Sequence, residues 1–250
     1  MVDRFDAARL KLKRANKHIA DVEEIVLGLP NAYRSAIEQD EKTGLNVIRY
    51  YPPDTEKLAS ELALIIGDAI HNLRTAIEYA YLGVVERRAP AAFDDKTKFP
   101  VRETKAFVEN ALKGRKIDVL CPALFKWIVA EVKPYRTEDG NIVVTCLHDF
   151  DVSDKHWLLT PMLQVFDATG IILEDENGRE ITGNTHSITV EGTGPYWIAF
   201  SRKFKVKDHG KVSPTVVFNE RNPFQGSTVL DTLSDFSKMA KYIVEILSKF

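Results

Sequence analysis

The chain is poor in cysteine, has no long apolar run and carries no excess of positive charge. Cys121 and Cys146 are its only cysteines, and both lie in apolar surroundings. They predict buried free thiols rather than the disulfide framework of a small secreted domain. No apolar run approaches the ~20 residues that span a bilayer, so we expect no membrane partner.

The charges are nearly balanced, because 34 basic and 36 acidic side chains give a formal net charge of −2. Without a global positive field, any nucleic-acid binding needs a local basic patch. The first residues, Met-Val-Asp-Arg-Phe-Asp, lack the apolar core of a secretory signal, and we expect a cytoplasmic location. Hydrophobic residues make up 44% of the chain and charged residues 28%, which is typical of a globular protein rather than a disordered one.

The first fifty residues predict a long helix followed by a hairpin. Apolar residues recur at three- and four-residue spacing over residues 3–29, and Gly28 and Pro30 are expected to close this helix. Two β-prone stretches, 33–38 and 45–51, flank a Lys-Thr-Gly turn. We expect these two stretches to pair as a small antiparallel hairpin.

A second long helix and several shorter ones follow. Asp54 or Thr55 is expected to cap the second helix, which runs to about Arg87. Shorter helices are predicted over residues 104–112, over 117–132 and over the first part of 142–157. Pro122 must lie in the first turn of the 117–132 helix or split it, because proline cannot donate the backbone hydrogen bond of a helix interior.

After residue 157 the sequence changes from helical to strand-like. Asn-Gly, Gly-Asn and Gly-Pro turn signals separate strand-like runs over residues 162–166, 170–174, 187–190, 196–204 and 215–218. Ser227 to Phe250 then reads as an amphipathic helix. Segregated rather than alternating helices and strands predict an α+β fold and not a doubly wound sheet.

We therefore expect one compact domain with three parts. The first is a helical bundle over residues 1–157 that includes the hairpin at 33–51. The second is a C-terminal antiparallel β-meander over 158–226, and the third is a closing helix over 227–250 that packs back on the bundle.

His71, Arg74 and Glu78 form a polar stripe on the second long helix. On a helical wheel at about 100° per residue, these three fall on one side, nearly opposite the main apolar face, with Gly67 in the same stripe. A helix that is apolar on nearly every side is normally covered on nearly every side. Gly67 costs helix stability relative to alanine, which indicates that another backbone approaches the helix there.

The stripe allows a functional and a structural interpretation. In the first, Arg74 binds a phosphate, His71 carries a proton near neutral pH, and Glu78 orients one of them. In the second, Arg74 and Glu78 pair along the helix because they are four residues apart, and His71 is a hydrogen-bonded core histidine. Spacing alone favours the structural interpretation, since paired charges are often only structural.

Residues 148–157 form a second polar segment, with two histidines and three aspartates that could supply metal ligands. Their spacing matches no closed zinc or calcium motif. Alternatively, Ser153 or Asp154 caps a turn while Lys155 and His156 pair with acids. We expect neither a bound metal nor a cofactor. The weaker metal-dependent hydrolase alternative would use His71, Glu78, His148 and Asp151.

Residues 67–79 read Gly-Asp-Ala-Ile-His-Asn-Leu-Arg-Thr-Ala-Ile-Glu-Tyr, residues 134–135 read Pro-Tyr, and residues 154–156 read Asp-Lys-His. Over roughly residues 50–160 the chain thus resembles a widespread set of uncharacterised bacterial proteins with G-D-x-x-H-N-L-R and D-K-H-R motifs. The first motif is in turn similar to the R-x4–6-H signature of HEPN domains. These are helical bundles, often dimeric, whose Arg and His cleave RNA without a metal in toxin–antitoxin and antiviral systems.

The resemblance implies that Arg74 faces phosphate and that Tyr79 stands where HEPN domains have histidine. Tyrosine has an ordinary pKa of about 10 and is a poor proton shuttle at neutral pH. Either His71 or His156 replaces the missing histidine, or the site no longer cleaves. Tyr79 could instead stack on a base. Further binding candidates from the two motifs are Asp68, Asn72 and Lys155.

Three functional hypotheses follow. The first is an RNA-directed HEPN-like protein of a toxin or antiviral defence system, active or degenerate, acting as a homodimer in which two polar stripes meet. The second is a non-catalytic module that binds a ligand or a protein partner through exposed aromatics such as Tyr196 and Trp197. The third is the metal-dependent hydrolase.

Overall fold

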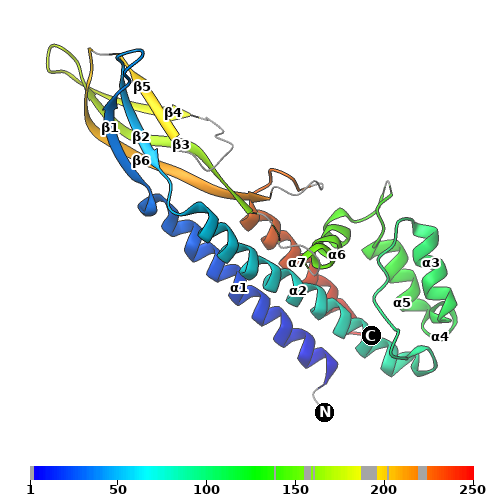
Figure 1. The fold of residues 1–250 in the computed structure, drawn as a ribbon. Coiled ribbons are helices and arrows are strands. Elements are labelled where there is room, and N and C mark those ends of the chain that lie inside the picture. The colour runs from blue at the N-terminus through cyan, green and yellow to red at the C-terminus, as the bar shows by residue number, and fades with distance from the viewer. Residues whose placement is uncertain are drawn as a thin grey trace.

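A long pair of helices forms the spine of the molecule, with a β-lobe at one end and short helices along its side (Figure 1). The computed structural model describes residues 3–137, 139–154, 159, 161–186, 196–201, 203–218 and 224–250. The fold is α+β, as the sequence predicts. None of the helices in the described ranges is long and apolar enough to cross a membrane.

Helices α1 (Arg4–Ala32) and α2 (Thr55–Arg88) are the two long helices of the spine. The Asp54 carboxylate accepts a hydrogen bond from the Lys57 backbone N–H, which confirms the predicted cap of α2. Helix α1 continues two residues beyond Pro30, further than predicted, because proline in the last turn forfeits only one backbone hydrogen bond. Fully buried alanines allow close approach of the two helices; they are Ala8, Ala15, Ala69, Ala76 and Ala80.

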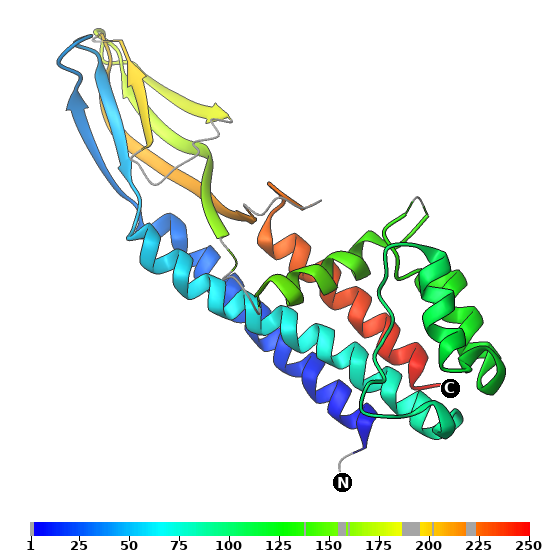
Figure 2. The same ribbon diagram turned by 45° about the vertical axis from the view of Figure 1, so that its right-hand side comes forward.

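Helices α6 (Ile142–Asp154) and α7 (Val229–Leu247) complete the bundle around α2. Asn141 begins α6, since its side-chain oxygen accepts hydrogen bonds from the backbone N–H groups of Val143 and Val144. Figure 2 shows α7 running along α2, and α6 crossing α7. Helix α6 thereby lies against the face of α2 that carries the polar stripe.

The segment between α2 and α6 forms a cluster of short helices. They are η1 (Pro90–Ala92), α3 (Lys105–Gly114), α4 (Ile117–Leu120), α5 (Pro122–Trp127) and the π-helical turn η2 (Ile128–Val132). Pro122 splits the predicted 117–132 helix and stands at the start of α5, where its missing N–H is not needed. Cys121 and Cys146 are free and buried, as predicted.

The β-lobe consists of two three-stranded antiparallel sheets. The first has the order β1 (Arg34–Gln39), β2 (Asn46–Tyr51), β5 (Tyr196–Phe200). The second has the order β4 (Glu180–His186), β3 (Pro161–Glu174), β6 (Lys205–Phe218). The β1–β2 hairpin is confirmed. A separate apolar core fills the lobe, with Ile48, Tyr50, Ala168, Ile171, Leu173, Ile198 and Val212.

The strand boundaries differ from the prediction in physically understandable ways. The runs 162–166 and 170–174 belong to one strand, β3, because the chain passes Gly170 (φ +73°) with a shift in register instead of turning. Strand β4 and the first part of β6 were not predicted, since both have few apolar residues: β4 is mostly uncharged and polar, and the first part of β6 carries several charges. The predicted strand 187–190 lies outside the described residues.

Candidate functional site

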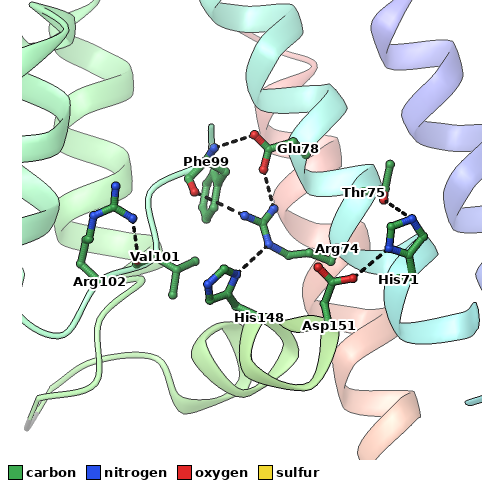
Figure 3. Close-up of polar contacts among 9 residues, drawn as sticks. All are labelled: His71, Arg74, Thr75, Glu78, Phe99, Val101, Arg102, His148 and Asp151. Carbon is green, nitrogen blue, oxygen red and sulfur yellow. Dashed lines mark hydrogen bonds and ion pairs between the residues drawn. The ribbon is translucent and has the colours of Figure 1, made fainter. Parts of the chain in front are cut away.

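A cleft of about 450 Å³ opens over the polar stripe of α2. Its walls come from α2, from α6 and from the segment that connects α2 to α3 (Figure 3). The lining side chains are His71, Arg74, Thr75, Glu78, Leu82, Asp95, Thr97, Lys98, His148, Asp151 and Val152. All three members of the predicted stripe therefore line one concave surface, together with residues that are distant in the sequence.

His71 and Asp151 form a hydrogen-bonded pair at one end of the cleft. The Nδ1 atom of His71 lies 2.9 Å from Asp151 Oδ1. The His71 side chain is 48% exposed, whereas that of Asp151 is 6% exposed. A carboxylate only accepts hydrogen bonds, so the neutral imidazole carries its proton on Nδ1 and leaves the Nε2 lone pair available. Only a long contact of 3.4 Å, from the Thr75 hydroxyl, reaches Nε2 in the part of the chain described.

Arg74 lies at the other end of the cleft and is 10% exposed. Its Nη1 donates to Glu78 Oε2 at 2.8 Å, its Nε to His148 Nδ1 at 3.3 Å, and its Nη2 to the Phe99 carbonyl at 3.4 Å. Glu78 accepts a further hydrogen bond from the Phe99 N–H at 2.9 Å. Each of the three guanidinium nitrogens thus has a partner inside the protein. This geometry corresponds to the structural interpretation for Arg74 and Glu78.

His148 is neutral in this network. Burial, and next the neighbouring Arg74 guanidinium, lower the pKa of His148 from 6.5 to about 4. Since arginine only donates hydrogen bonds, His148 Nδ1 must accept, and the proton of the imidazole resides on Nε2. His148 consequently holds the guanidinium in place without adding charge to the cleft.

Gly67 permits the close approach of α6 to α2. A Cβ atom at this position would lie 2.5 Å from both carboxylate oxygens of Asp154. The sequence predicted an approaching backbone, and the structure places a side chain of α6 there. One turn before Asp154 on the same helix lies Asp151, the partner of His71. The glycine therefore lies at the contact that brings Asp151 to His71.

The other predicted binding residues lie away from the cleft lining or outside the described ranges. Asp68 is exposed on α2. Asn72 is buried towards α1, where it accepts a hydrogen bond from Lys11 Nζ at 3.0 Å. Tyr79 packs partly buried against the main core. Lys155 and His156 belong to residues 155–158, which lie outside the described ranges.

The sequence placed His148 and Asp151 with His71 and Glu78 only in the metal-dependent alternative, and it did not connect His148 with Arg74. The three-residue spacing of His148 and Asp151 was the available signal, because residues three apart share one face of a helix. Lys98 and Thr97 had no comparable signal, since the loop that carries them has no periodicity. Among the described residues, no three side chains of His, Cys, Asp or Glu lie together as metal ligands would.

No protein-family model matches the chain, and no curated protein or solved structure matches it significantly.

Proposed function

We propose that the protein acts on RNA, as a HEPN-like ribonuclease that needs no metal, with His71 as the general base of the cleft. The observation that carries this proposal is the His71–Asp151 pair, whose 2.9 Å hydrogen bond links a half-exposed imidazole to a buried carboxylate. The carboxylate holds the ring so that Nε2 faces the substrate. RNA is proposed as the substrate because of the motif over residues 67–79.

In the proposed reaction, His71 Nε2 takes the proton of a ribose 2′-hydroxyl. The 2′-oxygen then forms a bond to the adjacent phosphorus, and the bond from phosphorus to the 5′-oxygen breaks. The leaving 5′-oxygen takes up a proton from the imidazolium or from water. Lys98, exposed in the cleft lining, stabilises the additional negative charge on the phosphate oxygens.

Arg74 is a positioning residue in this proposal and not the phosphate ligand that the motif implies. Its guanidinium nitrogens already bind Glu78, His148 and the Phe99 carbonyl. These contacts connect α2 to α6 and to the segment before α3, so that they hold the walls of the cleft together. Tyr79 takes no part, because its side chain packs against the core.

The test is cleavage of a labelled single-stranded RNA by the purified full chain in the presence of EDTA. Wild-type protein is expected to produce fragments with 2′,3′-cyclic phosphate ends. The His71→Gln substitution should lower the rate by about 10²- to 10⁴-fold, as is typical for loss of a general base. Asp151→Asn should lower it in the same direction, because the imidazole loses its fixed orientation.

Two controls accompany this test. Glu61→Gln changes an exposed carboxylate on the same helix, outside the cleft lining, and should leave the rate unchanged. A DNA strand of the same sequence has no 2′-hydroxyl and should remain intact. Cleavage that persists in the His71→Gln protein, or that EDTA abolishes, would refute the proposal.

A non-catalytic binding module is the second candidate, and one observation favours it. Trp197 on β5 is 54% exposed, which is unusual for so large an aromatic side chain. Wild-type protein that leaves RNA intact under all conditions, while Trp197→Ala abolishes recovery of a defined partner, would favour this candidate over the ribonuclease.

A further inference from the structure

A groove between α1 and α7 is lined by more cations than carboxylates, whereas the cleft is lined by more carboxylates than cations. Two of the described cleft-lining residues are permanently cationic, Arg74 and Lys98, and three are carboxylates, Glu78, Asp95 and Asp151. The cleft alone therefore does not attract a polyanion. The groove, of about 460 Å³, is lined by the cations Arg9, Lys13 and Lys241 and by one carboxylate, Glu245.

The basic groove originates in the sequence of α1. The first half of this helix carries one acid, Asp6, and six cations: Arg4, Arg9, Lys11, Lys13, Arg14 and Lys17. Arg9, Lys13 and Lys17 follow one another at four-residue spacing. They therefore form a line of positive charges about 6 Å apart along the helix axis. Arg9 and Lys13 lie in the groove, and Lys17 continues the line beyond it.

The cations of the groove are available to a ligand. Arg9 pairs with Asp6 at 2.9 Å and Lys241 with Glu245 at 3.9 Å, but all four side chains are more than half exposed. Exposed pairs of this kind contribute little stability and exchange readily with another anion. Lys13 and Lys17 have no ionic partner among the residues described.

The shape and surroundings of the groove suit a charged chain. Leu12 and Val244 give it an apolar floor between cationic walls from two helices. In Figure 1 these helices, α1 in blue and α7 in red, are both part of the bundle, and none of the groove residues lines the cleft. Tyr242 is 46% exposed on α7 but is not part of the groove lining.

We infer that the α1–α7 groove binds the phosphate backbone of single-stranded RNA through Arg9, Lys13 and Lys241. The choice of RNA rests on the proposed function, and the groove supplies the local basic patch that a chain of net charge −2 needs. A concave line of cations fits an extended phosphate chain better than the flat surface of an anionic bilayer.

The experiment measures binding of fluorescein-labelled oligouridylate by anisotropy over a series of salt concentrations, with full-length His71→Ala protein so that RNA is not consumed. The added substitutions Arg9→Gln, Lys13→Gln and Lys241→Gln should weaken binding. They should also reduce the slope of log affinity against log salt by about 2, because each phosphate contact on a single strand contributes ~0.7.

A matched control has the same change in charge at exposed lysines elsewhere, Lys105→Gln, Lys126→Gln and Lys211→Gln. Equal slopes for the groove variant and this control would overturn the inference. Binding to phosphatidylserine vesicles that depends on the groove residues, with an unchanged salt slope for RNA, would also overturn it.

Two further outcomes separate the groove from the proposed activity. RNA binding that depends on the groove, by a protein that never cleaves RNA, would support the groove and refute the proposed activity. Cleavage of RNA far below saturation that the groove substitutions leave unchanged, together with an unchanged salt slope, would overturn the groove and support the proposed activity.

Discussion

The two ends of the cleft use the same helix for different purposes. At the His71 end, a half-exposed imidazole points into the cleft and is held from below by one buried carboxylate. At the Arg74 end, a buried guanidinium gives its hydrogen bonds to Glu78, His148 and the Phe99 carbonyl. Three residues along the helix thus separate a half-exposed side chain from one whose guanidinium nitrogens all have partners inside the protein.

Arg74→Ala should have the largest effect on stability. It leaves Glu78 and His148 partly buried without their main partner, and loss of one member of a buried pair typically costs about 3 kcal/mol. Urea unfolding of the variant measures the loss. His71→Ala, at the exposed end of the same cleft, should destabilise the protein much less. Equal losses for the two variants would contradict the division between a buried, hydrogen-bonded end and an exposed end of the cleft.

The free energy of unfolding should depend on pH through the protonation of His148. Its folded-state pKa of about 4 lies below the ordinary value of 6.5, so the unfolded chain binds a proton first as the pH falls. The stabilisation that neutral His148 provides is complete above pH 6.5 and is lost between 6.5 and about 4. Because the ring is partly exposed, we expect a loss of about 1 to 2 kcal/mol.

Carboxylates also titrate in this range, so the measurement compares unfolding of wild type and His148→Asn at several pH values. The variant should lose less stability on acidification. Parallel curves for the two proteins would show that His148 is not held neutral by its surroundings, and the structural role of the Arg74 end would then rest on Glu78 and Phe99 alone.

Gly67→Ala should have the smallest effect and concerns the His71 end. A Cβ atom there crowds the Asp154 carboxylate, which outweighs the gain in helix propensity and should cost roughly 1 kcal/mol. Gly28→Ala in α1 is the matched control, because nothing lies within 4 Å of its added Cβ and it should stabilise the protein. Unfolding experiments in the Asp154→Ala background should show the cost disappear. A stabilising Gly67→Ala with Asp154 intact would contradict the close contact.

The helices could be predicted well because they depend on local signals. Asp54, Thr104 and Thr228 cap helices that begin where the sequence indicates. The strands were harder to predict from the sequence. The first half of β6 carries four exposed charged residues, so apolar alternation does not mark it, and β5 pairs with the hairpin strand β2 across a long stretch of sequence. Pairing between distant strands leaves no local pattern.

The candidate site, too, could be predicted where neighbouring residues of one helix form it and not where distant segments meet. The helical period alone determined that His71, Arg74 and Glu78 share one face of α2, and four-residue spacing already allowed the Arg74–Glu78 pair. The partners that give these residues different roles come from elsewhere. Phe99 precedes α3, and His148 and Asp151 lie on α6. No spacing rule connects positions so far apart.

The sequence by itself determined which residue types lie together on α2, because a helix repeats every 3.6 residues whatever surrounds it. It also determined the basic first half of α1. Only the tertiary structure decided which end of the stripe is exposed and which end makes its hydrogen bonds inside the protein. Exposure and hydrogen bonding depend on how closely α6 packs against α2 at Gly67, and that contact joins segments about eighty residues apart.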